Sequence, residues 1–224
     1  LIESNLRPNN DADKERLLRR VTLDLTGLPP TIAEIDSFLA DDSAKAYESV
    51  VDRLLKSPHF GERWGRHWLD LVRYGETLGH EFDYPLHNAW RYRDYVIDSL
   101  NKDKPFDQFI IEQLAGDLLP AKDLAEKRAH TVGLGFLSVG PKMLACDDPD
   151  KMRRDIVDEQ MDTMGRAFLG MTIGCARCHD HKFDPIPTTD YYALYGIFES
   201  TRFHNMSVGQ TPELQAKVDS IDQL

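Results

Sequence analysis

Apolar positions recur at helical spacing through most of the chain, and the first three predicted helices follow one another closely. The first is expected over 13–26, with Leu17, Leu18, Val21 and Leu25 as its apolar positions. Thr31 followed by Glu34 forms a capping box, a pairing that satisfies backbone donors at a helix start, so a second helix begins there. Its expected apolar face comprises Ile32, Ile35, Phe38 and Leu39. A third helix is expected over 43–56, and the three together form a scaffold without obvious chemistry.

The rest of the chain shows the same periodicity, interrupted by long irregular connections. The further helices are expected over 57–74, 90–100, 106–114, 124–132, 151–169 and 190–198. The stretch 75–88 breaks the pattern and is expected to be a long loop, of the kind that is often functional in compact domains. The chain is therefore predicted to be mainly α, as an irregular multi-helix domain with long loops.

Composition supports a globular fold and excludes some partners. The chain has 224 residues, of which 41% are apolar and 9% aromatic, enough for a real hydrophobic core. Its formal net charge of -11 offers no basic surplus to phosphate groups, so neither nucleic acid nor an anionic membrane is an expected partner. The longest apolar runs fall far short of the roughly 18 residues that span a bilayer, so no membrane insertion is expected.

Cys175, Cys178 and His179 spell C-x-x-C-H, the attachment signature of a c-type haem. In this chemistry two thiols add across the two vinyl groups of the porphyrin, and the adjacent histidine reaches the iron from one face. We therefore expect Cys175 and Cys178 to anchor one covalent haem per chain, with His179 as the proximal iron ligand. The other ring nitrogen of such a histidine usually donates to a carbonyl or carboxylate. The helical domain is expected to wrap around this C-terminal haem motif.

The same residues allow two other interpretations. A C-x-x-C pair is also typical of half a zinc site and of redox dithiols. In the zinc interpretation Cys175, Cys178 and one of His179 or His181 hold the ion, and Cys146 is the only further cysteine. A thioredoxin-type dithiol is expected after a strand and at the start of a helix, and no such pattern precedes Cys175.

The motif does not determine the sixth iron position. His67 lies beside Trp64 and Trp68 on a predicted helix and is the first candidate for a distal ligand, although a histidine satisfied by a nearby carboxylate is the simpler interpretation. The other candidates are His59, His87, His130, His204, Met143, Met161, Met164 and Met206. A histidine there favours a lower reduction potential and a methionine a higher one, whereas an open position favours binding or activation of a small ligand.

The predicted helix over 151–169 carries an acidic face. Its members are Asp155, Asp158, Glu159 and Asp162. Like charges at this spacing repel unless cations neutralise them. Arginines near in sequence are Arg153, Arg154 and Arg166. We expect a solvated or arginine-paired face, with a cation site or a carboxylate cluster near the haem as the alternative.

Five separated motifs give the chain a family resemblance. They are Arg19-Arg-Val-Thr-Leu-Asp-Leu-Thr-Gly-Leu-Pro-Pro-Thr31, Gly61-Glu-Arg-Trp-Gly-Arg-His-Trp-Leu-Asp70, Trp90-Arg-Tyr-Arg-Asp94, Glu112-Gln-Leu-Ala-Gly-Asp-Leu-Leu-Pro120 and Gly174-Cys-Ala-Arg-Cys-His-Asp-His-Lys-Phe-Asp-Pro185. In this order they resemble the planctomycete cytochrome-associated family called domain of unknown function 1549, over roughly 16–202. The resemblance implies an exported multidomain parent, often with a cytochrome-like module upstream and a further uncharacterised domain downstream. It implies no known reaction.

Together these observations predict an extracytoplasmic c-type cytochrome domain for electron transfer within a larger protein. Its expected partner is a redox protein or an adjacent cytochrome domain, and its expected location is periplasmic or extracellular, because c-type haem is attached outside the cytoplasm. Residues 1–202 are expected to form a single helical haem-binding domain, with a scaffold over 13–56 and haem-side elements over 57–202. Residues 203–224 are expected to be a linker or a cut end leading to a further domain. The alternatives are a haem enzyme, such as a peroxidase or an oxidase of an extracellular substrate, and a zinc-stapled binding module without redox activity.

Overall fold

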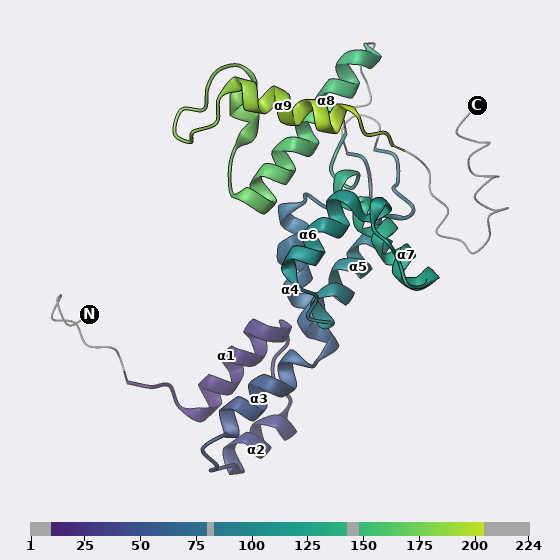
Figure 1. Ribbon diagram of the computed structural model, residues 1–224. Coiled ribbons are helices and arrows are strands. Elements are labelled where there is room, and N and C mark those ends of the chain that lie inside the picture. The colour runs from purple at the N-terminus through teal and green to yellow at the C-terminus, as the bar shows by residue number, and fades with distance from the viewer. Residues whose placement is uncertain (1–9, 80–82, 143–147, 204–224) are drawn as a thin grey trace. The chain divides into compact units, whose positions relative to one another are not determined.

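The computed structural model describes residues 10–79, 83–142 and 148–203 of the chain (Figure 1). Over these residues the protein is built from nine α-helices joined by loops and short turns, and its only β pairing is an isolated bridge between Thr77 and Pro85. The prediction of a mainly helical fold is confirmed. Within the same ranges, no helix combines the length and apolar character needed to cross a membrane.

The observed helices follow the predicted ones to within a few residues, except at the end of α8. The α-helices are α1 (Lys14–Thr26), α2 (Ile32–Ala40), α3 (Ala46–Leu55), α4 (Pro58–Leu71), α5 (Ala89–Asn101), α6 (Phe106–Ala115), α7 (Leu124–Gly133), α8 (Pro149–Met164) and α9 (Thr188–Glu199). The short turns are η1 (Gly116–Leu118), η2 (Leu134–Leu137), the π-helical η3 (Gly165–Leu169) and η4 (Ile173–Arg177). The single helix predicted over 151–169 is thus α8 followed by a separate π turn.

The chain packs as two compact units. The first comprises 1–66 and 97–103, and the second comprises 67–96 and 104–224. The predicted scaffold lies in the first unit and the C-x-x-C-H motif in the second. The domain limit at 202 and the linker role of 203–224 stay predictions, because nearly all of that segment lies outside the described residues.

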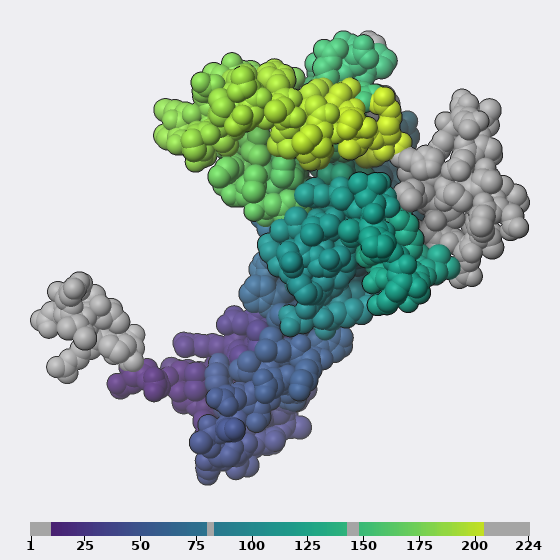
Figure 2. All heavy atoms as spheres, viewed as in Figure 1, coloured from purple at the N-terminus to yellow at the C-terminus, as the bar shows by residue number. Residues whose placement is uncertain are grey.

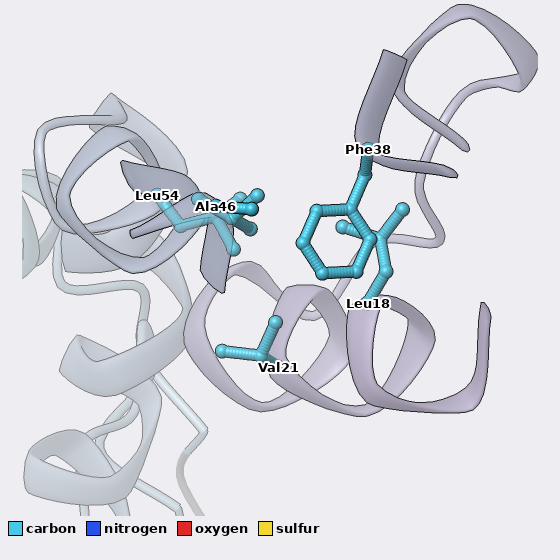
Figure 3. Packing of buried hydrophobic residues seen from close by; sticks show 6 residues of the cluster. Leu18, Val21, Phe38, Ala46 and Leu54 are labelled. Carbon is cyan, nitrogen blue, oxygen red and sulfur yellow. The ribbon is translucent and has the colours of Figure 1, made fainter. Parts of the chain in front are cut away.

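Three helices of the first unit bury a small apolar core (Figure 3). It comprises Leu18 and Val21 of α1, Phe38 of α2, and Ala46, Val50 and Leu54 of α3. The predicted capping box is present, since Thr31 Oγ1 accepts from the Glu34 N–H at 3.3 Å and the Glu34 carboxylate accepts from the Thr31 N–H at 2.7 Å. On α2, Phe38 is buried and Ile35 packs against the same core, whereas Ile32 and Leu39 are exposed. The apolar face of α2 is therefore narrower than predicted.

The second unit contains an aromatic cluster around Trp68 of α4, whose side chain is half-buried. The indole packs against Phe109 and Phe168, with ring centroids 5.0 and 5.7 Å away. Its N–H donates to the Tyr92 hydroxyl and the Gln113 side-chain oxygen at 3.0 and 3.1 Å. The Tyr92 hydroxyl donates to the same Gln113 oxygen at 2.5 Å. Gln113 and Tyr92 are both buried, so these bonds satisfy polar groups that have little access to water.

The end of α8 directs the chain toward the candidate motif. A Cβ added at Gly165 would lie 2.7 Å from the end of the Ile173 side chain, so a larger residue there would require that side chain to move. Gly170 then adopts φ 65°, the left-handed conformation that glycine favours. Leu169, the last residue of the π turn η3, is exposed. Figure 2 shows α8, the segment that joins it to α9, and α9 itself, coloured green to yellow, packed together.

Candidate functional site

The first part of the C-x-x-C-H motif is the 3-10 turn η4, between α8 and α9. Ile173 and Ala176 are buried, whereas Cys175, Cys178 and His179 are exposed and neither thiol forms a disulfide. The alternation follows from the geometry of about three residues per turn, which puts Ile173 and Ala176 on an inner face and the two cysteines on an outer one. The turn therefore presents both thiols on one side, above buried apolar residues.

A bond to the backbone orients the His179 ring. Its Nδ1 lies 2.8 Å from the carbonyl oxygen of Asp180, so Nδ1 carries the proton and donates it to that oxygen. In the neutral ring Nε2 then has a lone pair, which is the form in which imidazole binds a metal. This is the tautomer that a proximal iron ligand requires.

His181, two residues further on, is committed to the loop itself. Its side chain is 4% exposed, its Nδ1 accepts from the Asp184 and Phe183 N–H groups at 2.8 and 3.3 Å, and its Nε2 lies 3.0 Å from the Thr172 hydroxyl. The Asp184 carboxylate is 3.4 Å from Nδ1. Because that nitrogen already accepts backbone hydrogen bonds, we assign a neutral ring with its proton on Nε2 rather than an ion pair. Both ring nitrogens therefore fix the shape of the loop.

The ligands of the zinc interpretation do not converge. In the ranges 10–79, 83–142 and 148–203, no three His, Cys, Asp or Glu side chains form a group that could hold a metal ion. His181 is engaged within the loop, and Cys146 lies outside the described residues. A closed tetrahedral zinc site needs four ligands.

Arg177, inside the motif, ties η4 to α8 and α9. Its Nη1 donates to Asp158 Oδ2 at 3.1 Å, and its Nη2 lies 3.9 Å from Asp155 Oδ1. The other Asp158 oxygen accepts the Tyr191 hydroxyl at 2.5 Å. Burial alone would lower the pKa of Arg177, but the charge of Asp158 and its neighbours raises that pKa above its usual value. Burial and the bond to Asp158 raise the pKa of Tyr191, so both donors keep their protons at neutral pH.

The acidic face of α8 is paired with cations. The pairs are Lys151 with Asp155 at 2.5 Å, Arg177 with Asp158 at 3.1 Å, Arg73 with Glu159, and Arg166 with Asp162 at 2.7 Å. The expectation of a paired face is confirmed, but two of the cations, Arg73 and Arg177, come from distant parts of the sequence. Arg153, predicted as a partner, instead pairs with Glu199 at 2.9 Å. These pairs offset the repulsion among the carboxylates, so a bound cation is not needed to explain the face.

Comparison with known proteins gives the motif a family context. Residues 1–203 match the family model PSCyt2, described as a protein of unknown function (DUF1549). The chain belongs to this family. A search of curated proteins and a search of solved structures returned no match. The DUF1549 match spans all five sequence motifs and confirms the resemblance seen in them, but it assigns no activity.

Several side chains of this DUF1549 chain are candidates for the sixth iron position. His67 is exposed on α4 and belongs to the same compact unit as the motif. His130 is buried, with Nε2 3.7 Å from the Glu112 carboxylate. Of the others, His87 is exposed, Met161 and Met164 are buried in α8, His59 pairs with Glu62, and His204, Met143 and Met206 lie outside the described residues. The assignment of His67 stays a prediction.

Large apolar side chains precede and follow the C-x-x-C-H motif along this DUF1549 chain. Leu169 before it and Phe183 after it are 54% and 84% exposed. Tyr192 is 53% exposed and donates its hydroxyl to the Arg177 carbonyl at 3.2 Å, which places it at the motif. Exposed apolar side chains around one site are typical of a surface that binds an apolar group. Leu169, Phe183 and Tyr192 are therefore the exposed apolar side chains that lie near the motif in sequence or contact it.

Lys142 was not among the residues that the sequence singled out. Its Nζ donates to the carbonyl oxygens of Ser138 and Gly140 at 2.5 and 3.1 Å, and its backbone N–H donates to Leu78 of the 75–88 loop at 3.0 Å. Burial, with a smaller contribution from the charge of Arg73, lowers the pKa of Lys142 to about 8. The burial depends on a loop distant in sequence, so no local pattern reveals it.

We expect the Lys142 amine to titrate near pH 8 in the folded protein and near pH 10.4 when unfolded, as free lysine does. Between these values the unfolded state binds more protons, so the free energy of unfolding should rise with pH across this window. The rise should be about 1–2 kcal/mol, because partial exposure reduces the full effect.

NMR of the reductively methylated protein measures the Lys142 midpoint, with the exposed Lys102 as the internal reference. The free energy of unfolding, measured from pH 7 to 10 for wild type and for Lys142→Gln, gives the effect of this one amine as the difference between the two proteins. A midpoint equal to that of Lys102 would contradict the prediction.

Proposed function

We propose that this DUF1549 chain is an extracytoplasmic c-type cytochrome domain, which binds one covalent haem and transfers electrons within a larger exported protein. The observation that carries the proposal is the motif turn. Cys175 and Cys178 are exposed on one side of it, and His179 keeps Nδ1 bonded to a backbone carbonyl. Two thioether bonds and one imidazole are the attachment that a c-type haem uses.

Each motif residue has a distinct role in this proposal. Cys175 and Cys178 would hold the porphyrin through thioether bonds, and His179 Nε2 would bind the iron from one face. The haem, when bound, supplies one-electron redox chemistry. Leu169 and Phe183 would cover part of the ring, and the exclusion of water by such side chains tunes the reduction potential.

The surface position of the turn supports electron transfer. Both thiols are exposed, so an attached porphyrin would keep an edge that a partner can approach. The net charge of -11 favours a partner with a basic docking surface, because opposite charges raise the rate of association. The partner would be a redox protein or an adjacent cytochrome domain, in the periplasm or outside the cell, where c-type haem is attached.

The deciding experiment is a pyridine haemochrome spectrum of the chain produced in a host with c-type maturation machinery, together with iron and zinc analysis. We expect a c-type band, about one iron per chain, and a pigment that survives acid-acetone extraction. Colourless protein with stoichiometric zinc would contradict the proposal and favour the zinc-stapled module.

His67→Ala should convert a low-spin, six-coordinate haem spectrum into a high-spin one, because it removes the predicted distal imidazole. Absorption and electron paramagnetic resonance spectra measure the change. His87→Ala, which removes another exposed histidine of the same unit, is the matched control and should leave the spectrum unchanged.

An unchanged spectrum in His67→Ala would eliminate His67 as a ligand, and the other histidines and the methionines would stay as candidates for the sixth iron position. A wild-type spectrum that is already high spin, with turnover of peroxide, would favour the haem-enzyme alternative over electron transfer.

A further inference from the structure

Asp158 of α8 joins three elements around the motif. Its Oδ2 accepts from Arg177 Nη1 at 3.1 Å and its Oδ1 accepts from the Tyr191 hydroxyl at 2.5 Å. Tyr191 is 1% exposed and the Asp158 side chain is 28% exposed. One partly buried carboxylate therefore links α8, the motif turn and α9.

The bonds from α9 to the motif segment complete the arrangement. The Tyr192 hydroxyl donates to the Arg177 carbonyl at 3.2 Å, and the Thr188 N–H donates to the Asp180 carboxylate at 2.9 Å. Cys178 and His179 lie between these two anchored residues in the chain. The part of the motif that would bind the porphyrin and the iron is thus held at both of its ends.

The turn needs such anchors because its own hydrogen bonds are weak. η4 has five residues, and a 3-10 turn of that length has poor hydrogen-bond geometry and does not persist alone. Hydrogen bonds in which a partner is ionised are roughly twice as strong as neutral ones. Asp158 makes two, one of them to a positively charged donor inside the motif, so it is the strongest single anchor that the described contacts provide.

We infer that Asp158 is a positioning residue for the motif: through Arg177 and Tyr191 it holds η4 in the conformation that presents Cys175, Cys178 and His179 before a cofactor is attached. That η4 is held in this way for haem attachment rests on the proposed function, whereas the hydrogen bonds that hold η4 do not depend on it. A different expectation follows if Asp158 is only one of several like charges on α8. Neutralising it would then relieve repulsion and leave the motif segment as it is.

The test is amide hydrogen exchange, measured by mass spectrometry on the full chain produced without haem, and covalent haem yield after maturation. In Asp158→Asn, exchange over 172–188 should accelerate about tenfold or more, equivalent to about 1.4 kcal/mol of local opening free energy. Exchange in α5 and α6 should stay unchanged, which separates a local effect from global unfolding. The haem yield of this variant should fall.

Three further variants calibrate the effect. Tyr191→Phe removes one hydrogen bond without a change of charge and should accelerate exchange over 172–188 less than Asp158→Asn. Asp155→Asn should have a smaller effect still, because Asp155 lies 3.9 Å from Arg177. Asp98→Asn, which breaks an exposed pair with Lys102 on α5, should not alter the motif segment.

Two results would overturn the inference. One is unchanged exchange over 172–188 in Asp158→Asn, and the other is an equal acceleration in α5 and α6. Neither depends on haem. A wild-type chain that attaches no haem, in which Asp158→Asn still loosens 172–188, would defeat the proposed function but not the positioning role. If the wild-type chain attaches haem and Asp158→Asn has the same haem yield and the same exchange rates, the positioning role would be refuted and the proposed function would stand.

Discussion

Replacement of Cys175 and Cys178 together by alanine should abolish covalent haem attachment. In the proposed attachment the thioether bonds would form at these two sulfur atoms, which are exposed and outside any disulfide, and no other group of the motif has a thiol to replace them. The variant chain should lose its colour on acid-acetone extraction and give no haem stain on a denaturing gel. Because the two side chains are exposed, the change should leave helix content by circular dichroism intact.

The third cysteine of the chain supplies the control. Cys146→Ala should keep full covalent haem, since Cys146 is outside the C-x-x-C-H motif. Each single variant, Cys175→Ala or Cys178→Ala, should retain at most one thioether bond and show a shifted haemochrome band. Covalent pigment that persists in the double variant would refute the cytochrome interpretation as a whole.

Gln113→Leu should strongly destabilise the second unit. The leucine is close in size to glutamine but removes the oxygen that accepts from both the Tyr92 hydroxyl and the Trp68 indole N–H. A buried donor left without a partner costs about 1–3 kcal/mol, so the free energy of unfolding should fall by about 2–4 kcal/mol. In a chain of this size that corresponds to a decrease in Tm of roughly 5–15 °C.

Gln160→Leu is the matched control for this change. Gln160 is also buried, but its side chain makes one described bond, to the Leu137 carbonyl at 2.9 Å, so a loss of about 1 kcal/mol is expected. Urea unfolding followed by circular dichroism compares the two variants. Equal losses would show that the hydrogen bonds centred on Gln113 do not stabilise the second unit more than one ordinary buried bond.

Helix positions were predictable because their signals are local. The Thr31 and Glu34 capping box begins α2 as expected, and α1 ends where Gly27 adopts φ 71°, two residues after Leu25, the last apolar position of that helix. The end of α8 was not predictable, since the apolar pattern continues through Phe168 and Leu169. The backbone changes there from α to π geometry, beginning at Gly165, which packs against Ile173 of the motif segment.

The candidate site likewise has features that the sequence predicts and features that depend on the folded structure. The spacing of Cys175, Cys178 and His179 predicts haem attachment before any fold is known. The hydrogen bond from His179 to the Asp180 carbonyl and the enclosure of His181 by its own loop depend on backbone geometry that the spacing does not encode. The sequence suggested arginines of the same helix as partners for the acidic face. Arg73 provides one partner instead, because pairing depends on distance in space rather than along the chain.

By itself, the sequence determined the family, the mainly helical class, most helix positions and the candidate attachment residues, because each of these depends on short-range spacing or on motifs read in order. Only the tertiary structure decided the tautomer of His179, the lowered pKa of Lys142 and the link from Asp158 to Arg177 and Tyr191. The tautomer depends on the local backbone at Asp180, which residue spacing does not encode. The other two features arise where segments far apart in the chain meet, since burial and charge pairing are set by what surrounds a group in space.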